Sequence, residues 1–113
     1  MIWVLTGPEC SGKSSLAAQL HAHLDWPLLP ELARAYLDGR HAQSGSYCYR
    51  PSDLLNLASM QTRAEALTCN KGDAILDTDL LTLVVWWQEK FGPVPRQLSS
   101  QWHCQATRRY CLL

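Results

Sequence analysis

One short motif near the amino terminus constrains the fold of this chain more than any other feature. Residues Gly7-Pro8-Glu9-Cys10-Ser11-Gly12-Lys13-Ser14 match G-x-x-x-x-G-K-[ST] at every position. An apolar run over 2–6 precedes the motif and a helix-like segment follows it, as in a phosphate-binding loop. Two glycines let the backbone N–H groups turn toward an anion, and the following helix adds the positive end of its dipole. The motif predicts a triphosphate site in an α/β fold.

Each polar group of the loop has an expected role. We expect Lys13 to reach the β- and γ-phosphates and the hydroxyl of Ser14 to ligate Mg²⁺. Ser15 is placed to contact a phosphate nearer the nucleoside. The remaining residues of the expected cofactor-binding set are Gly7, Glu9, Cys10, Ser11 and Gly12. The expected cofactors are therefore ATP and Mg²⁺.

Composition narrows the classes of partner. The 113 residues suffice for one domain, and the formal net charge of zero, without a basic block, gives no sign of nucleic-acid or membrane binding. The apolar run at the amino terminus stops at Gly7, too early for a signal peptide or a membrane span. Five cysteines without C-x-x-C spacing argue against a disulfide framework and a zinc site. We expect a cytoplasmic protein with reduced thiols.

The first elements follow a β–loop–α order. A continuous apolar run over 2–6 is typical of a buried parallel strand. From Lys13 to Leu24, apolar residues recur at helical spacing, which predicts a helix packed on that strand. A short second strand is predicted over 26–29.

A helix is expected over 31–37, ended by Gly39. Glu31 and Arg34 then lie just past a strand end, where ligands bind in open parallel sheets. The stretch 40–50 has no periodicity and predicts a loop that could cover a site.

A long helix is predicted from about Ser52, a plausible N-cap after Pro51, to Cys69. Its expected inward stripe is Leu57, Met60, Ala64 and Leu67. Gln61 and Arg63 could point into a nucleoside site, although a solvated face is the favoured interpretation for both.

A third strand is predicted over 74–76 and runs into Asp77-Thr78-Asp79. An aspartate at the end of an apolar strand is typical of a Walker B element, which holds Mg²⁺ against the phosphates. For Asp77 we favour this metal-site role. Asp79 is either a site residue or the N-cap of the next helix.

The remaining segments complete an α/β pattern. A helix is predicted over 80–90 with its stop at Gly92-Pro93, then a loop and a short helix over 93–104. Residues 108–113 predict a fourth strand. An apolar strand without a covering helix has an exposed edge or face, so we expect self-association through it.

Three motifs in this order resemble the ribosylnicotinamide kinase domain of bacterial NadR-type proteins, an AAA-like family of P-loop NTPases. They are the loop Gly7 to Ser14, then Pro30-Glu31-Leu32-Ala33-Arg34, then Asp77-Thr78-Asp79-Leu80-Leu81-Thr82. The positions of Trp86 and Phe91-Gly92 also fit the family pattern. The resemblance covers nearly the whole chain.

The resemblance implies a reaction. It implies transfer of the ATP γ-phosphate to the 5′-hydroxyl of nicotinamide riboside, which gives nicotinamide mononucleotide for NAD salvage. Glu31 is then a candidate for binding the riboside hydroxyls or orienting the attacking one, and Arg34 and Asp79 are candidate substrate ligands. Asp77 is a candidate base as well as a metal partner.

The family resembled continues beyond a fourth strand with a further strand, a lid and a helix. We therefore expect an incomplete kinase-like domain that lacks the lid, without adenylyltransferase or DNA-binding regions. Two alternatives remain open: a catalytically incompetent nucleotide-binding or regulatory module, and a P-loop kinase or ATPase with another acceptor. In the latter, Glu31 and Arg34 would be incidental helix residues.

Overall fold

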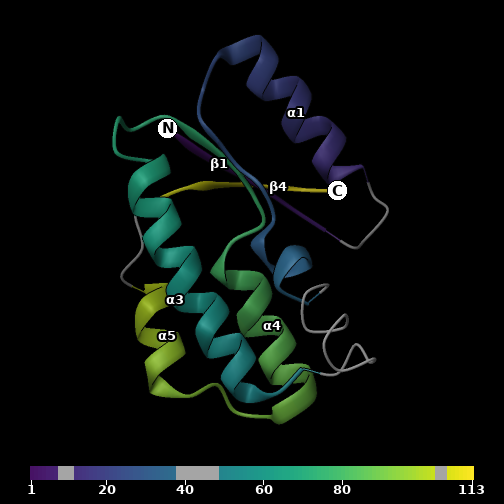
Figure 1. Cartoon of the computed structure of the whole chain (residues 1–113), viewed down its shortest axis with the longest axis vertical. Helices are drawn as coiled ribbons and strands as arrows, with labels where there is room; N and C mark the ends of the chain where they lie inside the picture. The colour runs from purple at the N-terminus through teal and green to yellow at the C-terminus, as the bar shows by residue number, and fades with distance from the viewer. Residues whose placement is uncertain (8–11, 38–48, 104–106) are drawn as a thin grey trace.

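The structure is a computed structural model that describes residues 1–7, 12–37, 49–103 and 107–113 (Figure 1). Within these ranges the elements, in chain order, are β1 (Ile2–Thr6), α1 (Lys13–Leu24), β2 (Leu28–Leu29), a short helix over 32–37, α3 (Pro51–Thr68), β3 (Ala74–Asp77), α4 (Leu80–Phe91), α5 (Arg96–His103) and β4 (Arg109–Leu112). The predicted α/β order is confirmed.

The strands of the described residues form one parallel sheet in the order β2-β3-β1-β4. The first strand of the chain, β1, therefore has neighbours on both sides. Its register with β3 places Leu5 opposite Asp77. Because all strands point the same way, their carboxyl ends meet at one edge, which brings Asp77 beside the end of β1.

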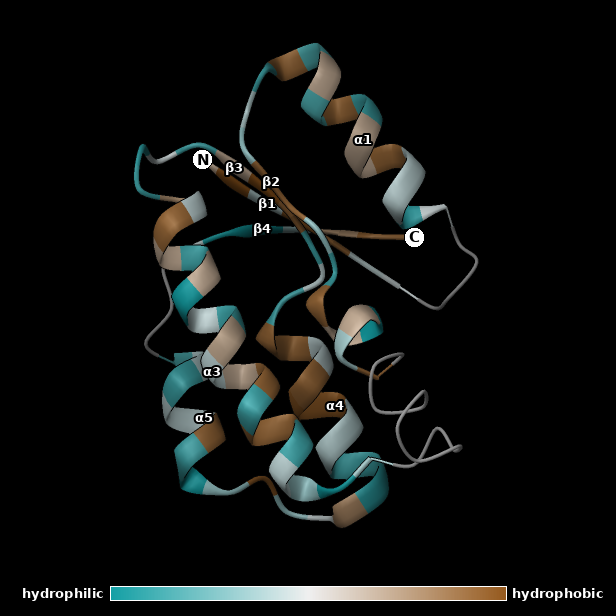
Figure 2. Ribbon diagram, viewed as in Figure 1, coloured by the Kyte–Doolittle hydropathy of each residue, from teal (hydrophilic) through white to brown (hydrophobic). Residues whose placement is uncertain are grey.

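Different helices cover the two faces of the sheet (Figure 1). On one face, Leu5 and Ile75 pack with Ala17 of α1. On the other face, Val4 and Leu76 pack near α3, and α3 also joins α4 and α5 in a separate helical core. Figure 2 shows the apolar colour concentrated in β1, β2 and β3, whereas β4 changes from hydrophilic at its start to hydrophobic at its end.

The face under α1 is not closed. An apolar cavity of about 360 Å³ lies between this helix and the sheet. Its lining residues are Trp3, Leu5, Leu16, Leu20, Leu24, Ile75 and Cys111. Among the residues that the structure describes, no helix is both long enough and apolar enough to cross a membrane.

The predicted helix over α3 is present, but its predicted N-cap was wrong. The helix starts at Pro51, so that the extended Arg50 is the N-cap and Ser52 lies inside the first turn. The Asp53 carboxylate explains the shift, because it accepts a hydrogen bond of 2.8 Å from the backbone N–H of Arg50 and so caps the helix two residues earlier.

The predicted inward stripe of α3 was also wrong in part. Met60 and Leu67 are 41% and 78% exposed, whereas Leu57 is buried as expected. The buried residues of α3 are Asp53, Leu54, Leu57, Ala58, Gln61 and Glu65. The apolar pattern was misleading because polar side chains occupy three of the inward positions, where they form hydrogen bonds with other polar groups.

Two other predictions differ at their boundaries or fall outside the described residues. Strand β2 covers Leu28–Leu29 rather than 26–29, because Pro27 has no N–H to donate; its carbonyl still accepts a hydrogen bond from Ile75. The predicted stop at Gly39 and most of the predicted loop over 40–50 lie outside the described residues.

Candidate functional site

Two glycines of the motif have backbone conformations or surroundings that require glycine. Gly12 is the left-handed N-cap of α1, with a φ of 86°. Gly7 has a φ of 151°, and a Cβ atom there would lie 2.7 Å from the backbone oxygen of Leu113. Glu9, Cys10 and Ser11, which we expect to contact phosphate, lie outside the described residues.

Lys13 and Ser14 open α1 at the carboxyl end of β1. Lys13 is buried, which is rare for a lysine without a polar environment, and Ser15 is exposed beside it. The Oγ of Ser14 donates a hydrogen bond of 2.8 Å to Oδ2 of Asp77. The structure thus brings together the two side chains that the sequence assigns to the metal.

The second carboxylate oxygen of Asp77 is the one unusual feature of this pair. Asp77 is buried, and within the described part of the chain its Oδ1 has no hydrogen-bond partner. A buried carboxylate oxygen without a partner is costly, so such an atom calls for an explanation. A cation bound next to Ser14 would supply it.

The donor set fits Mg²⁺ rather than a soft metal. No group of three or more His, Cys, Asp or Glu side chains forms a metal site among the residues described. Mg²⁺ is commonly held by one or two protein oxygens, with waters and substrate phosphates completing the octahedron. A hydroxyl from Ser14 and a carboxylate from Asp77 match this requirement.

The turn after β3 is strained and firmly held. Thr78 has a φ of 67°, a left-handed conformation that is unfavourable for a β-branched residue. Its backbone N–H donates to the carbonyl of Leu5 over 2.9 Å. Asp79 follows as the N-cap of α4, and its Oδ1 accepts from the N–H of Leu81 over 3.1 Å.

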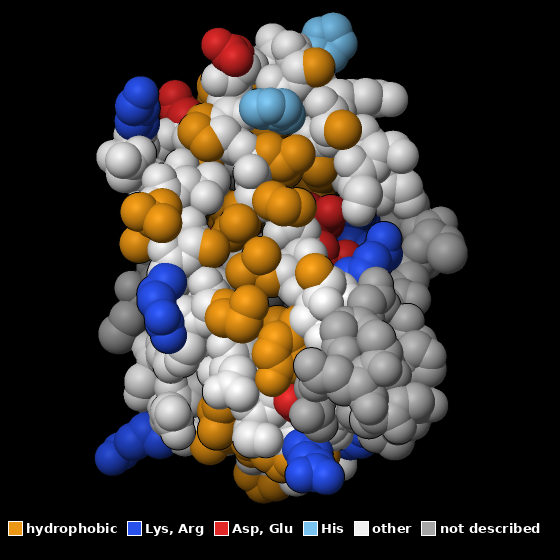
Figure 3. All heavy atoms as spheres, in the orientation of Figure 1, with side chains coloured by type: hydrophobic (Ala, Val, Ile, Leu, Met, Phe, Trp, Pro, Cys, Tyr) orange, Lys and Arg blue, Asp and Glu red, His pale blue; other side chains and the backbone are white. Residues whose placement is uncertain are grey.

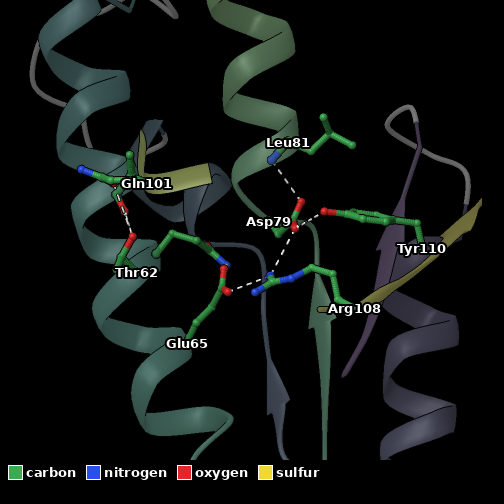
Figure 4. A network of polar contacts seen from close by, with 9 residues as sticks. Thr62, Glu65, Asp79, Leu81, Gln101, Arg108 and Tyr110 are labelled. Carbon is green, nitrogen blue, oxygen red and sulfur yellow. Dashed lines mark hydrogen bonds and ion pairs between the residues drawn. The ribbon is translucent and has the colours of Figure 1, made fainter. Parts of the chain in front are cut away.

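Asp79 is more than a helix cap. Its Oδ2 accepts hydrogen bonds from Tyr110 at 2.7 Å and from Arg108 at 3.2 Å (Figure 4). Of the two open interpretations of Asp79, the structure shows the N-cap. It also shows ion pairing and hydrogen bonding that the sequence did not suggest.

Arg108 links this turn to α3. Its Nη1 donates to Glu65 over 2.8 Å (Figure 4). Gln61 donates to the other oxygen of Glu65, also over 2.8 Å. Gln61, favoured from sequence as solvated, is therefore buried in this network, while Arg63 is exposed as expected. Burial, and then the charge of Glu65, raise the pKa of the Cys69 thiol, which keeps Cys69 protonated at neutral pH.

Sequence reasoning missed Glu65, Arg108 and Tyr110. Arg108 and Arg109 are only two adjacent arginines and do not form a basic patch, so the charge of Arg108 did not indicate a functional role. The available signal was the alternation of a strand: Arg108 and Tyr110 are two residues apart and share a face, opposite to Arg109.

Glu31 and Arg34 lie beside the site as an ion pair. Their closest charged atoms, Nη2 of Arg34 and Oε2 of Glu31, are 3.8 Å apart, with Arg34 largely exposed and Glu31 mostly buried. The adjoining Leu32 and Ala33 line a small cleft with Thr78 and Asp79. Gln61 and Thr82 contribute its polar groups.

Comparison with known proteins supports the fold and its family. The model of the AAA domain family matches residues 2–113. None of the curated proteins compared with the chain matches it. Among solved structures, the crystal structure of the YorR protein from Bacillus subtilis in complex with phosphorylated GDP is similar, with a TM-score of 0.51 and 19% sequence identity. The similarity covers 99% of this chain and 59% of YorR.

Proposed function

This chain belongs to the AAA domain family of P-loop NTPases, and on that basis we propose that it binds ATP with Mg²⁺ and phosphorylates a small nucleoside. The first acceptor to consider is nicotinamide riboside, whose phosphorylation at the 5′-hydroxyl gives nicotinamide mononucleotide for NAD salvage. The observation that carries the proposal is the 2.8 Å hydrogen bond from Ser14 to Asp77, whose other oxygen is buried without a hydrogen-bond partner among the described residues.

The proposed chemistry needs alignment and charge neutralisation more than reactive side chains. A new bond joins the acceptor 5′-oxygen to the γ-phosphorus, and the bond from that phosphorus to the β–γ bridging oxygen breaks to leave ADP. Lys13 would neutralise charge on the phosphates. Ser14 and Asp77 would hold Mg²⁺, which would supply further charge neutralisation. The hydroxyl proton goes to a carboxylate, for which Glu31 and Asp77 are the candidates.

The surface beside the β3–α4 turn is the proposed acceptor side; the cleft there has room for about one water molecule, so the nucleoside would lie over the cleft and not inside it. Glu31 and Arg34 stand on either side of Leu32-Ala33 in the sequence, and Leu32 and Ala33 line this cleft. Asp79 also lines it. YorR was crystallised with phosphorylated GDP, so guanosine and its phosphates belong in the acceptor panel together with nicotinamide riboside.

The direct test is ADP release with a panel of nucleosides in the presence of Mg²⁺ and ATP. We expect nicotinamide riboside to be the preferred acceptor and Lys13→Ala to lower kcat/KM by about 100-fold or more, as expected when a charged group facing the transferred phosphate is removed. Lys71→Ala is the matched control, because Lys71 is exposed in the turn between α3 and β3.

Other outcomes assign a different function. Turnover that Lys13→Ala leaves unchanged would rule out this mechanism. Binding of ATP without transfer to any acceptor would favour a nucleotide-binding or regulatory module, and transfer to an unrelated acceptor would indicate another P-loop kinase.

We also propose self-association through β4 and a cytoplasmic location. β4 lies at one end of the strand order, and Leu112 is 80% exposed there. Strand edges with exposed apolar side chains pair with other chains. The proposed use of ATP and the five cysteines without C-x-x-C spacing support this location.

A further inference from the structure

We propose that Arg108 and Tyr110 are positioning residues: they hold Asp79, and through the strained turn at Thr78 they keep Asp77 oriented toward the metal. This inference rests on the proposed Mg²⁺–nucleotide site. It assigns a task to a buried polar network that neither helix capping nor the phosphate loop explains.

The first step concerns the turn itself. Thr78, with its φ of 67°, stands between Asp77 and Asp79. A conformation of this kind costs free energy and persists only where its surroundings hold it on both sides. On one side, the N–H of Thr78 is fixed by the carbonyl of Leu5 in β1. The other side depends on what holds Asp79.

The second step concerns Asp79. Its side chain is 1% exposed and accepts hydrogen bonds from Leu81, Arg108 and Tyr110. The bond from Leu81 alone would satisfy an N-cap. Arg108, just before β4, and Tyr110, within β4, therefore hold the Asp79 carboxylate with two hydrogen bonds that the helix N-cap does not require.

The third step concerns Arg108. Its side chain is 5% exposed and pairs with Glu65 of α3 as well as with Asp79. Because the charges are shielded from solvent, these pairs are weakened little by salt, and loss of the cation would leave two carboxylates facing each other. Arg108 thus ties α3 to the β3–α4 turn, at the residue two positions after Asp77.

The experiment measures how much Mg²⁺ improves ATP binding, as the ratio of the ATP dissociation constants in EDTA and in Mg²⁺. We expect Tyr110→Phe and Arg108→Gln each to reduce this ratio about tenfold, the effect typical of losing a side chain that orients a metal ligand. ATP affinity in EDTA should stay unchanged. If affinity falls equally with and without Mg²⁺, the role is merely structural and the proposal is wrong.

A double-mutant cycle tests whether the effect passes through Asp79. Asp79→Asn keeps a good helix N-cap but removes the charge that Arg108 and Tyr110 contact. We expect Arg108→Gln or Tyr110→Phe to have no further effect in the Asp79→Asn background. If the double variant reduced the Mg²⁺ effect by the product of the two single reductions, Asp79 and its donors would act independently, and the proposal would be wrong.

Arg109→Gln is the matched control for charge. Arg109 is the next residue, is exposed, and points to the opposite face, with its guanidinium carbon 5.9 Å from the centre of the Trp3 ring. Arg109→Gln removes one positive charge, as Arg108→Gln does. We expect the Mg²⁺ effect on ATP binding to be unchanged in the Arg109→Gln protein.

Hydrogen exchange of the nucleotide-free protein separates this inference from the proposed function. In Tyr110→Phe, the amides of Thr78 and Leu81 should exchange at least about tenfold faster than in the wild type, while amides in the middle of α3 should not change. Unchanged exchange at both amides would refute the positioning role even if ATP binds. Absence of Mg²⁺-dependent ATP binding in the wild type would instead refute the proposed function.

Discussion

At the scale of single residues, Asp77 shows how a functional group lowers stability. One oxygen accepts a hydrogen bond from Ser14, whereas the other is buried with no hydrogen-bond partner in the described ranges. In the absence of a cation this second oxygen is unfavourable, because it has lost water without gaining a donor. Selection for stability alone would not keep an aspartate there.

We therefore predict opposite effects of Asp77→Asn on stability and on ligand binding. The amide keeps an acceptor for Ser14 and removes a buried charge, so the free energy of unfolding in EDTA should rise by about 1 kcal/mol. The Mg²⁺ effect on ATP binding should be lost. Urea denaturation and calorimetric titration measure the two quantities.

Asp25→Asn is the control for this substitution. Asp25 is exposed with a φ of 55°, a conformation that asparagine also tolerates. The free energy of unfolding of the Asp25→Asn protein should differ from that of the wild type by less than about 0.5 kcal/mol. A destabilised Asp77→Asn protein beside an unchanged Asp25→Asn protein would contradict the argument.

At the scale of elements, α3 serves two environments along its length. Leu54 and Leu57 pack in the helical core with α4, while Ala64 and Cys69, near the other end and just beyond it, pack against the sheet residues. Between them, Gln61 and Glu65 face the polar network. The buried face of α3 therefore combines apolar and polar positions within one helix.

This arrangement predicts contrasting effects of two leucine truncations on the same helix. Leu54 is fully buried, so Leu54→Ala should lower the free energy of unfolding by about 3 kcal/mol. Leu67→Ala should change it by less than about 0.5 kcal/mol, because this leucine is mostly exposed. Equal losses in urea denaturation would show that the apolar pattern, and not the structure, identifies the inward face.

The elements themselves were largely predictable from the sequence, because local patterns determine them. The apolar run over 2–6, the N-cap at Asp79 and the stop at Gly92 each correspond to an observed boundary. The face of α3 was less predictable, since Gln61 and Glu65 are buried only by virtue of Arg108. Burial of a polar side chain depends on its partner, and no local pattern contains that partner.

The candidate site divides in the same way. The motif and the strand-end aspartate predicted Lys13, Ser14 and Asp77, and the structure joins Ser14 to Asp77 across 63 positions. Strand alternation places Tyr110 and Arg108 on one face, but their contact with Asp79 was not predictable, because it requires knowing that β4 pairs with β1 and not with β2. Strand order is a property of the assembled sheet.

At the scale of the whole molecule, apolar surface remains uncovered. Figure 3 shows apolar side chains in a band down the middle of one face. Separately, the cavity under α1 opens beside β1 and Cys111 of β4. Uncovered apolar surface of this kind promotes association between molecules.

We predict that Leu112→Lys weakens self-association, because a lysine on an edge strand opposes pairing with another chain. Sedimentation velocity over a range of concentrations should show a lower average mass than for the wild type. Leu67→Lys adds the same charge at a similarly exposed leucine on α3 and should not alter the mass. A wild type that stays monomeric at high concentration would contradict the prediction.

The position of β1 inside the sheet has a consequence for how the protein is made. Its residues Ile2 and Trp3 pair with Ala74 and Arg109, which leave the ribosome much later. Pairings between such distant segments slow folding, and the nascent chain carries an apolar strand without neighbours in the meantime. Ser14 likewise meets Asp77 only after β3 has been synthesised. We therefore expect the growing chain to depend on chaperones and to become able to bind nucleotide only after β3 has paired with β1.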